Sequence, residues 1–120
     1  MLRHSTRVIC ALLFLTTAGH AQPSTSRGQI SVAQVRAMLD QAATNPTARQ
    51  TLTAYLAGSG ETAGWLLDTA RGLAPCARRL SLDAQQARDA IAGAAAATET
   101  PATPLIIRDM LRRAGCRLTE

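Results

Sequence analysis

The chain is predicted to be all-α, a small bundle of four to five helices closed by one disulfide. Four stretches place apolar residues at the three- and four-residue spacing of an amphipathic helix. No stretch alternates apolar and polar residues over the length of a strand, so no sheet is expected. Two cysteines, Cys76 and Cys116, stand about 40 positions apart and can join the last helix to an earlier part of the chain.

The N-terminus has the three parts of a secretory signal. Residues 1–7 carry two arginines and no acid, Val8–Ala18 is apolar, and Gly19-His20-Ala21 places small residues at a cleavage site. The apolar run is shorter than the roughly 20 residues that cross a bilayer. We therefore expect residues 1–21 to be a cleaved signal that sends the chain to the periplasm without a stable membrane anchor. The alternative is a retained N-terminal membrane helix.

The chain that remains after cleavage has little catalytic chemistry. Residues 22–120 hold 11 arginines and eight acids but no lysine and no histidine. Without these residues there is no Ser-His pair, no Cys-His pair and no Schiff-base lysine, and two cysteines are too few for a zinc site. We expect no enzyme activity, no catalytic residue, no metal and no cofactor. Most acids are expected on solvent-facing sides: Asp40, Glu61, Asp68, Asp83, Asp89, Glu99 and Asp109.

Cys76 and Cys116 are the only cysteines beyond the signal. Two cysteines in an exported chain are expected to form one disulfide, and the alternative is two free thiols. Closing a loop of about 40 residues stabilises the fold by roughly 4 kcal/mol in the chain-entropy model. This stabilisation matters because alanine dominates the apolar residues and buries little area.

Residues 22–29 are polar and are expected to form a flexible leader, and residues 30–118 a single domain. The first helix is predicted from Ser31 to about Ala43, because Ser31 and Gln34 have the spacing of a capping box. Its inward face is predicted to hold Val32, Val35, Met38, Leu39 and Ala42.

The second helix is predicted to follow Asn45, a good cap, with Pro46 at its first position. Three glycines, Gly58, Gly60 and Gly64, weaken it by about 1 kcal/mol each. They either let another helix pack closely, which we favour, or kink the helix near Gly60. The predicted inward stripe holds Leu52, Tyr55, Leu56, Ala63, Leu66 and Ala70.

A third helix is predicted from Ser81 to about Ala97, after a break over residues 71–75. Ser81 would cap it, and Asp83 would lie in its first turn, where it suits the helix dipole. The predicted inward face holds Ala84, Ala87, Ile91 and Ala95.

The fourth helix is predicted to run through Ala114, with Thr103 as its cap, Pro104 at its start and Gly115 as its C-cap. The disulfide would tie its end to the start of the third helix. Its predicted inward residues are Ile107, Met110, Leu111 and Ala114.

The disulfide would also gather arginines at one end of the molecule, namely Arg78, Arg79, Arg112, Arg113 and Arg117. Such a patch could engage an acidic partner through charge-assisted contacts. The alternative is that these are ordinary solubilising arginines near helix ends. Nucleic acid is not expected as a partner, because the chain is exported and the patch has no interleaved aromatic residues.

Several motifs follow one another between Ile30 and Cys116. The capped first helix precedes Tyr55-Leu56-Ala57-Gly58 in the second, then Cys76 stands ahead of Ser81-Leu82-x-x-Gln85. A Pro-Ala turn and a last helix ending Ala114-Gly115-Cys116 complete the order. In this order and cysteine spacing the chain resembles the Rap/Tai-type immunity proteins of type VI secretion amidase effectors.

The resemblance implies a small periplasmic protein, often a homodimer, that plugs the active-site groove of a peptidoglycan-cleaving amidase. The partner would be the cognate amidase effector, and the role would be protection against sibling cells. Aromatic residues and arginine are the commonest interface anchors. The expected partner-binding residues are therefore Tyr55, Trp65, Arg78, Arg79, Arg112 and Arg113, with core packing as the alternative for Tyr55 and Trp65.

Two other functions fit a short, exported helical chain with one disulfide. One is a periplasmic acid-stress chaperone that resembles HdeA, which needs carboxylates as its acid trigger. Eight acids outnumbered by arginines make a poor trigger. The other is a helical envelope protein with no soluble ligand.

Overall fold

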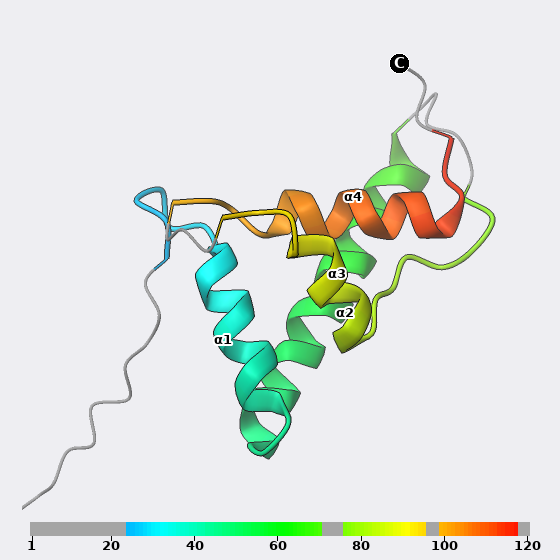
Figure 1. Ribbon diagram of the computed structural model, residues 1–120. Helices are drawn as coiled ribbons and strands as arrows, with labels where there is room; N and C mark the ends of the chain where they lie inside the picture. Colours follow the sequence, from blue (N-terminus) through cyan, green and yellow to red (C-terminus); the bar gives the residue numbers. More distant parts are fainter. Residues whose placement is uncertain (1–23, 71–75, 96–98, 118–120) are drawn as a thin grey trace, which may run out of the picture.

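The computed structural model describes residues 24–70, 76–95 and 99–117, and these residues contain four helices. They are α1 (Val32–Ala42), α2 (Pro46–Thr69), α3 (Ala84–Ile91) and α4 (Thr103–Ala114), and these residues contain no strand. Figure 1 shows α3 between α1 and α4, and both α1 and α4 pack against the long α2. The predicted all-α fold is confirmed, whereas the predicted signal over residues 1–21 lies outside the described residues.

The starts of α1 and α2 follow from local capping, as the sequence predicts. The Ser31 hydroxyl accepts a hydrogen bond from the Gln34 amide at 3.1 Å, and the Gln34 side chain accepts one from the Ser31 amide at 2.9 Å. The Asn45 side chain accepts hydrogen bonds from the amides of Thr47 and Ala48. Each cap satisfies amides that the first turn leaves without a helical partner.

α2 runs unbroken past its glycines. A Cβ built on Gly60 would lie less than 3.0 Å from the carbonyl oxygen of Leu80, whereas Gly58 and Gly64 have nothing within 4 Å. Gly60 therefore permits a close approach, but the favoured explanation, close packing of another helix, was wrong about the partner. The partner is the irregular segment that precedes α3, not a second helix.

The predicted start of the third helix was wrong. Asp83, not Ser81, is the N-cap: its carboxylate accepts from the Gln86 amide at 2.8 Å, and the Gln86 side chain accepts from the Asp83 amide at 3.0 Å. This reciprocal pair satisfies two amides, which a serine followed three residues later by alanine cannot do. The residues before Asp83 are then free to pass close to Gly60.

The predicted end of the third helix, near Ala97, was also wrong, because α3 ends at Ile91. A guanidinium from α1 lies at this end. Arg36 donates to the carbonyl of Ala94 at 2.9 Å and to that of Ile91 at 3.4 Å. Arginine here satisfies carbonyls that have lost their helical donors.

α4 ends as predicted but begins without a side-chain cap. Ala102 occupies the N-cap position, and the hydroxyl of Thr103, the predicted cap, instead lies 3.0 Å from the hydroxyl of Tyr55. Gly115 has φ of 68°, the left-handed conformation in which a helix commonly stops. The amide of Cys116 then donates to the carbonyl of Leu111 at 3.1 Å.

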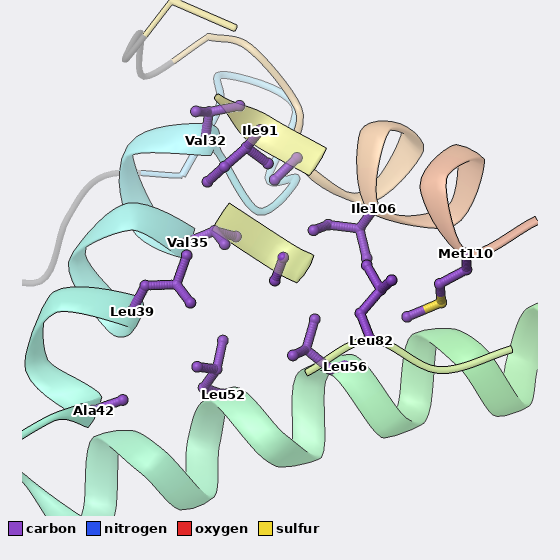
Figure 2. Close-up of a cluster of buried hydrophobic side chains, with 12 residues drawn as sticks. Val32, Val35, Leu39, Ala42, Leu52, Leu56, Leu82, Ile91, Ile106 and Met110 are labelled. Carbon is purple, nitrogen blue, oxygen red and sulfur yellow. The ribbon is translucent and has the colours of Figure 1, made fainter. Parts of the chain in front are cut away.

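The core lies where the three shorter helices meet α2 (Figure 2). Its largest fully buried side chains come from α1, α3 and α4. On α4 the buried apolar residues are Ile106, Met110 and Ala114, so the predicted inward positions of Ile107 and Leu111 were wrong. The predicted inward positions of Leu66, Ala70, Ala84 and Ala95 were wrong as well, because all four are exposed.

The disulfide between Cys76 and Cys116 is present, as predicted. It joins the end of α4 to the irregular segment before α3, rather than to the start of α3 itself. The Arg78 amide donates to the carbonyl of Ala114 at 3.1 Å and reinforces this junction. Residues 76–80 are therefore fixed against α4 at one end and against Gly60 of α2 at the other.

Candidate functional site

The six residues that the sequence singles out as partner contacts fall into two groups. Three are exposed and make no side-chain hydrogen bond or ion pair within the described part of the chain, whereas the other three already bind side chains of the same molecule. The first group is Trp65, Arg78 and Arg79, and the second is Tyr55, Arg112 and Arg113.

Tyr55 joins α2 to the start of α4. Its ring is half-buried against the core, and its hydroxyl shares a hydrogen bond of 3.0 Å with the Thr103 hydroxyl. Burial raises the pKa of Tyr55, and the hydrogen bond with Thr103 opposes this change. A hydroxyl engaged in this way is satisfied within the fold, so Tyr55 acts here as a structural contact between two helices.

Arg112 and Arg113 converge on one buried carboxylate. Asp109 of α4 is only 9% exposed, so its predicted place on a solvent face was wrong. Arg112 donates from Nε to one of its oxygens at 3.1 Å, and Arg113 pairs with the other. Arg113 also lies 3.6 Å from Asp89 of α3. Two guanidiniums three and four residues ahead on the helix thus compensate the burial of this charge.

The ionisation of Asp109 favours the folded state. Burial raises its pKa, but the hydrogen bonds and positive charges of Arg113 and Arg112 outweigh burial and hold the pKa below the usual value of an aspartate. Because the pKa is lower in the folded than in the unfolded chain, the stabilisation is present above the unfolded value of about 4. It is lost as the pH falls through the folded-state pKa.

Asp109→Asn is expected to lower the free energy of unfolding by about 1–2 kcal/mol at pH 7, since it removes charge-assisted hydrogen bonds. Urea unfolding measures this loss, which should vanish in acid below the folded-state pKa. Asp40→Asn is the matched control. It removes an ion pair with Arg88 in which the Asp40 side chain is 71% exposed. The free energy of unfolding should therefore fall by at most about 0.5 kcal/mol. An equal loss for Asp109→Asn at both pH values would contradict a charge effect.

A groove lies between the last three turns of α2 and residues 76–80, and we call it the α2 groove. Trp65, which is 65% exposed, lines it from α2, and Arg78 and Arg79 line it from the facing segment. Leu66, the next residue of α2, is also exposed but does not line the groove. The α2 groove therefore brings together the three members of the predicted set whose side chains make no hydrogen bond or ion pair within the described residues, and leaves out the other three.

Charges of both signs surround the tryptophan in the α2 groove. Glu61 and Asp68 line it from α2, opposite Arg78 and Arg79. An exposed aromatic residue flanked by arginines is typical of the energetically dominant part of a protein–protein interface. The wall that carries the arginines is held by the disulfide and by the Leu80 contact at Gly60, so little ordering would be needed on binding.

Three other arginines satisfy carbonyls at helix ends, a role that sequence analysis missed. Arg88 donates to the carbonyl of Leu39 at 2.8 Å, Arg49 donates to that of Ala42 at 3.1 Å, and Arg36 serves the end of α3. No local signal identifies these pairs of Arg88 and Arg36, because donor and acceptor come from distant parts of the sequence. Only the Asp109 cluster, with its spacings of three and four, carried a recognisable pattern.

The described residues contain no group of three or more His, Cys, Asp or Glu side chains arranged to hold a metal ion. Nor does this part of the chain include a helix with the length and apolar character needed to span a membrane. Comparisons with protein-family models, with curated proteins and with solved structures find no match. The surface chemistry of the described residues therefore carries the functional argument.

Proposed function

We propose that this chain is a periplasmic immunity protein that binds and inhibits a peptidoglycan amidase effector of type VI secretion. It acts stoichiometrically, without catalysis of its own, and shields the cell that makes it from the effector of sibling cells. The α2 groove is the docking surface, with Trp65 as its apolar anchor.

The observation that carries the proposal is the exposure of Trp65 in the α2 groove, whose facing segment, residues 76–80, is held in place by the disulfide and by the contact between Leu80 and Gly60. A tryptophan that is 65% exposed contributes little to its own fold and presents a large apolar surface to a partner. Arg78 and Arg79, on the facing segment, have no carboxylate partner among the described residues and can pair with acidic groups of a second protein. The order of the sequence motifs and the cysteine spacing support an amidase as that protein.

An affinity pull-down from envelope extract tests the proposal. The oxidised protein serves as bait at neutral and at acid pH, and mass spectrometry identifies what is retained. Capture of one stoichiometric cell-wall amidase at neutral pH, and loss of its activity when the bait is added, is the expected result. Retention of many unrelated proteins in acid alone would instead support an acid-stress chaperone.

Trp65→Ala is expected to weaken binding of the captured amidase at least tenfold, because exposed aromatic anchors carry much of an interface's energy. Calorimetric titration measures this change. The free energy of unfolding should stay within about 0.5 kcal/mol of the original value, as for other exposed positions. Leu66→Ala is the matched control and should leave the affinity unchanged. Equal losses of affinity for the two variants would contradict the α2 groove as the docking surface.

A further inference from the structure

The disulfide that closes the fold is also part of the α2 groove. Cys76 lines the groove together with the residues that follow it, and Cys116 lies just past the end of α4. Both cysteines are partly exposed rather than enclosed in the core, and exposure to solvent is what exchange with an external thiol requires. The covalent link therefore lies at the proposed docking surface, within reach of redox chemistry.

Residues 76–80 have few attachments to the helices apart from this disulfide. One is the hydrogen bond of 3.1 Å from the Arg78 amide to the Ala114 carbonyl, and another is the contact of Leu80 with Gly60. Three of these five residues are exposed, and neither arginine uses its side chain in a hydrogen bond or ion pair within the described chain. A segment held by so few contacts becomes mobile when its main restraint is removed.

The helical core does not draw on the residues that carry the arginines. Its buried apolar cluster comes from the four helices and their flanking residues, and Leu80 is the one member of residues 76–80 that packs against it. Trp65 belongs to α2 and keeps its place when the disulfide opens. Opening of the bond therefore acts first on the position of Arg78 and Arg79 relative to Trp65, while the helices keep their contacts with one another.

The charges around the two cysteines favour exchange of the disulfide. Arg78 and Arg79 follow Cys76 by two and three positions, and Arg117 directly follows Cys116. The acids that line the α2 groove belong to α2, on its opposite side. Positive charge stabilises the thiolate that leaves when a disulfide is attacked. The pair is thus placed where disulfides exchange readily, unlike one enclosed among apolar side chains.

We propose that the disulfide between Cys76 and Cys116 is a redox switch for the α2 groove, opened by a dithiol reductant. One thiolate of the dithiol attacks a sulfur of the pair, the S–S bond breaks, and the other cysteine leaves as a thiolate. The second thiol of the reductant then displaces the mixed disulfide. The dithiol ends as a disulfide, and its two electrons and two protons pass to the cysteines. Residues 76–80 are then no longer held opposite Trp65, and the affinity for the partner falls.

This inference rests on the proposed function, because the partner is the protein that binds the α2 groove. The switch limits binding to an oxidising compartment, since disulfides persist there and thiol reductants keep cysteines reduced in the cytoplasm. A newly made chain would therefore not engage its partner until the disulfide has formed.

Calorimetric titration of the captured amidase with oxidised, dithiothreitol-reduced and reoxidised protein tests the switch. The reduced protein, freed of dithiothreitol, is expected to bind at least tenfold more weakly, because residues 76–80 must be ordered again on binding. Reoxidation should restore the affinity. The double variant Cys76→Ala, Cys116→Ala should bind like the reduced protein and should not respond to dithiothreitol. Equal affinities of the oxidised and reduced protein would overturn the proposal.

Val35→Ala is the control for a general loss of stability. Val35 is fully buried on α1 and does not line the α2 groove, so its truncation weakens the core and leaves the disulfide in place. This variant should bind the amidase normally, and circular dichroism should show intact helices both in it and in the reduced protein. A loss of affinity in Val35→Ala equal to that on reduction would overturn the proposal.

A second measurement needs no partner and so separates failure of the switch from failure of the proposed function. Backbone NMR spectra of the oxidised and reduced protein are compared. Chemical-shift changes are expected at residues 76–80, at residues 115–117 and along the part of α2 that lines the groove, whereas α1 and α3 should keep their shifts. Changes spread evenly over α1 and α3 would show that reduction loosens the whole fold, and would overturn the proposal. Confined changes with no amidase captured would support the switch and refute only the partner.

Discussion

Replacing Cys76 and Cys116 together by alanine is expected to lower the free energy of unfolding by about 4 kcal/mol. The disulfide closes a loop with a sequence separation of 40 residues, and the cross-link removes conformations chiefly from the unfolded chain. Small domains are stable by only about 5–15 kcal/mol, so this loss is large. Urea unfolding of the oxidised protein and of the double variant measures it.

Reduction of the original protein with dithiothreitol is the control for this prediction. It breaks the same cross-link without changing any side chain in the core, so both samples should show a similar loss. The hydrogen bond from the Arg78 amide to the Ala114 carbonyl should also break once the disulfide is gone, and both groups should then bind water, because residues 76–80 lose one of their two anchors. Unfolding curves that coincide for oxidised and reduced protein would contradict the prediction, because they would show that the cross-link does not stabilise the fold by restricting the conformations of the unfolded chain.

Helix starts that depend on neighbouring residues could be predicted from the sequence. The capping pair of Ser31 and Gln34, and the Asn45-Pro46 start of α2, involve hydrogen bonds over two or three residues only. The same reasoning should have placed the start of α3. Asp83 is followed by Gln86 in the same spacing as Ser31 and Gln34, so the signal for the correct cap was present in the sequence.

Features set by distant residues could not be predicted. α3 ends at Ile91, whose carbonyl accepts a hydrogen bond from Arg36, a residue 55 positions earlier in the chain. Gly60 faces a carbonyl oxygen that only the tertiary fold brings to it. Apolar spacing also failed on α4, because Asp109 occupies a buried position that the pattern reserves for apolar residues, and Arg112 and Arg113 compensate its charge.

The exposure of the candidate contact residues could not be predicted from the sequence. Their role as partner contacts stays a prediction. Sequence alone could not tell Tyr55, whose hydroxyl is bonded to Thr103, from Trp65, which projects from α2. Both lie on one helix with glycines nearby, and which of them is covered depends on where α4 crosses that helix.

Gly60→Ala is expected to lower the free energy of unfolding by about 2 kcal/mol. The new Cβ would lie less than 3.0 Å from the Leu80 carbonyl oxygen, and a backbone atom cannot move aside as the end of a flexible side chain could. Forcing an atom into packed structure costs about 1–3 kcal/mol or more, and the better helix propensity of alanine returns only about 1 kcal/mol. Chemical denaturation of oxidised protein measures the difference.

Gly64→Ala is the matched control, since it makes the same chemical change one turn later on the same helix. Nothing lies within 4 Å of its added Cβ, so only the helix propensity changes, and stability should rise by up to about 1 kcal/mol. The two substitutions should therefore change the free energy of unfolding in opposite directions, and the two variants should differ in stability by about 3 kcal/mol. If Gly60→Ala proved as stable as Gly64→Ala, residues 76–80 would not be pressed against α2. The wall that holds Arg78 and Arg79 beside Trp65 would then lose one of its two anchors.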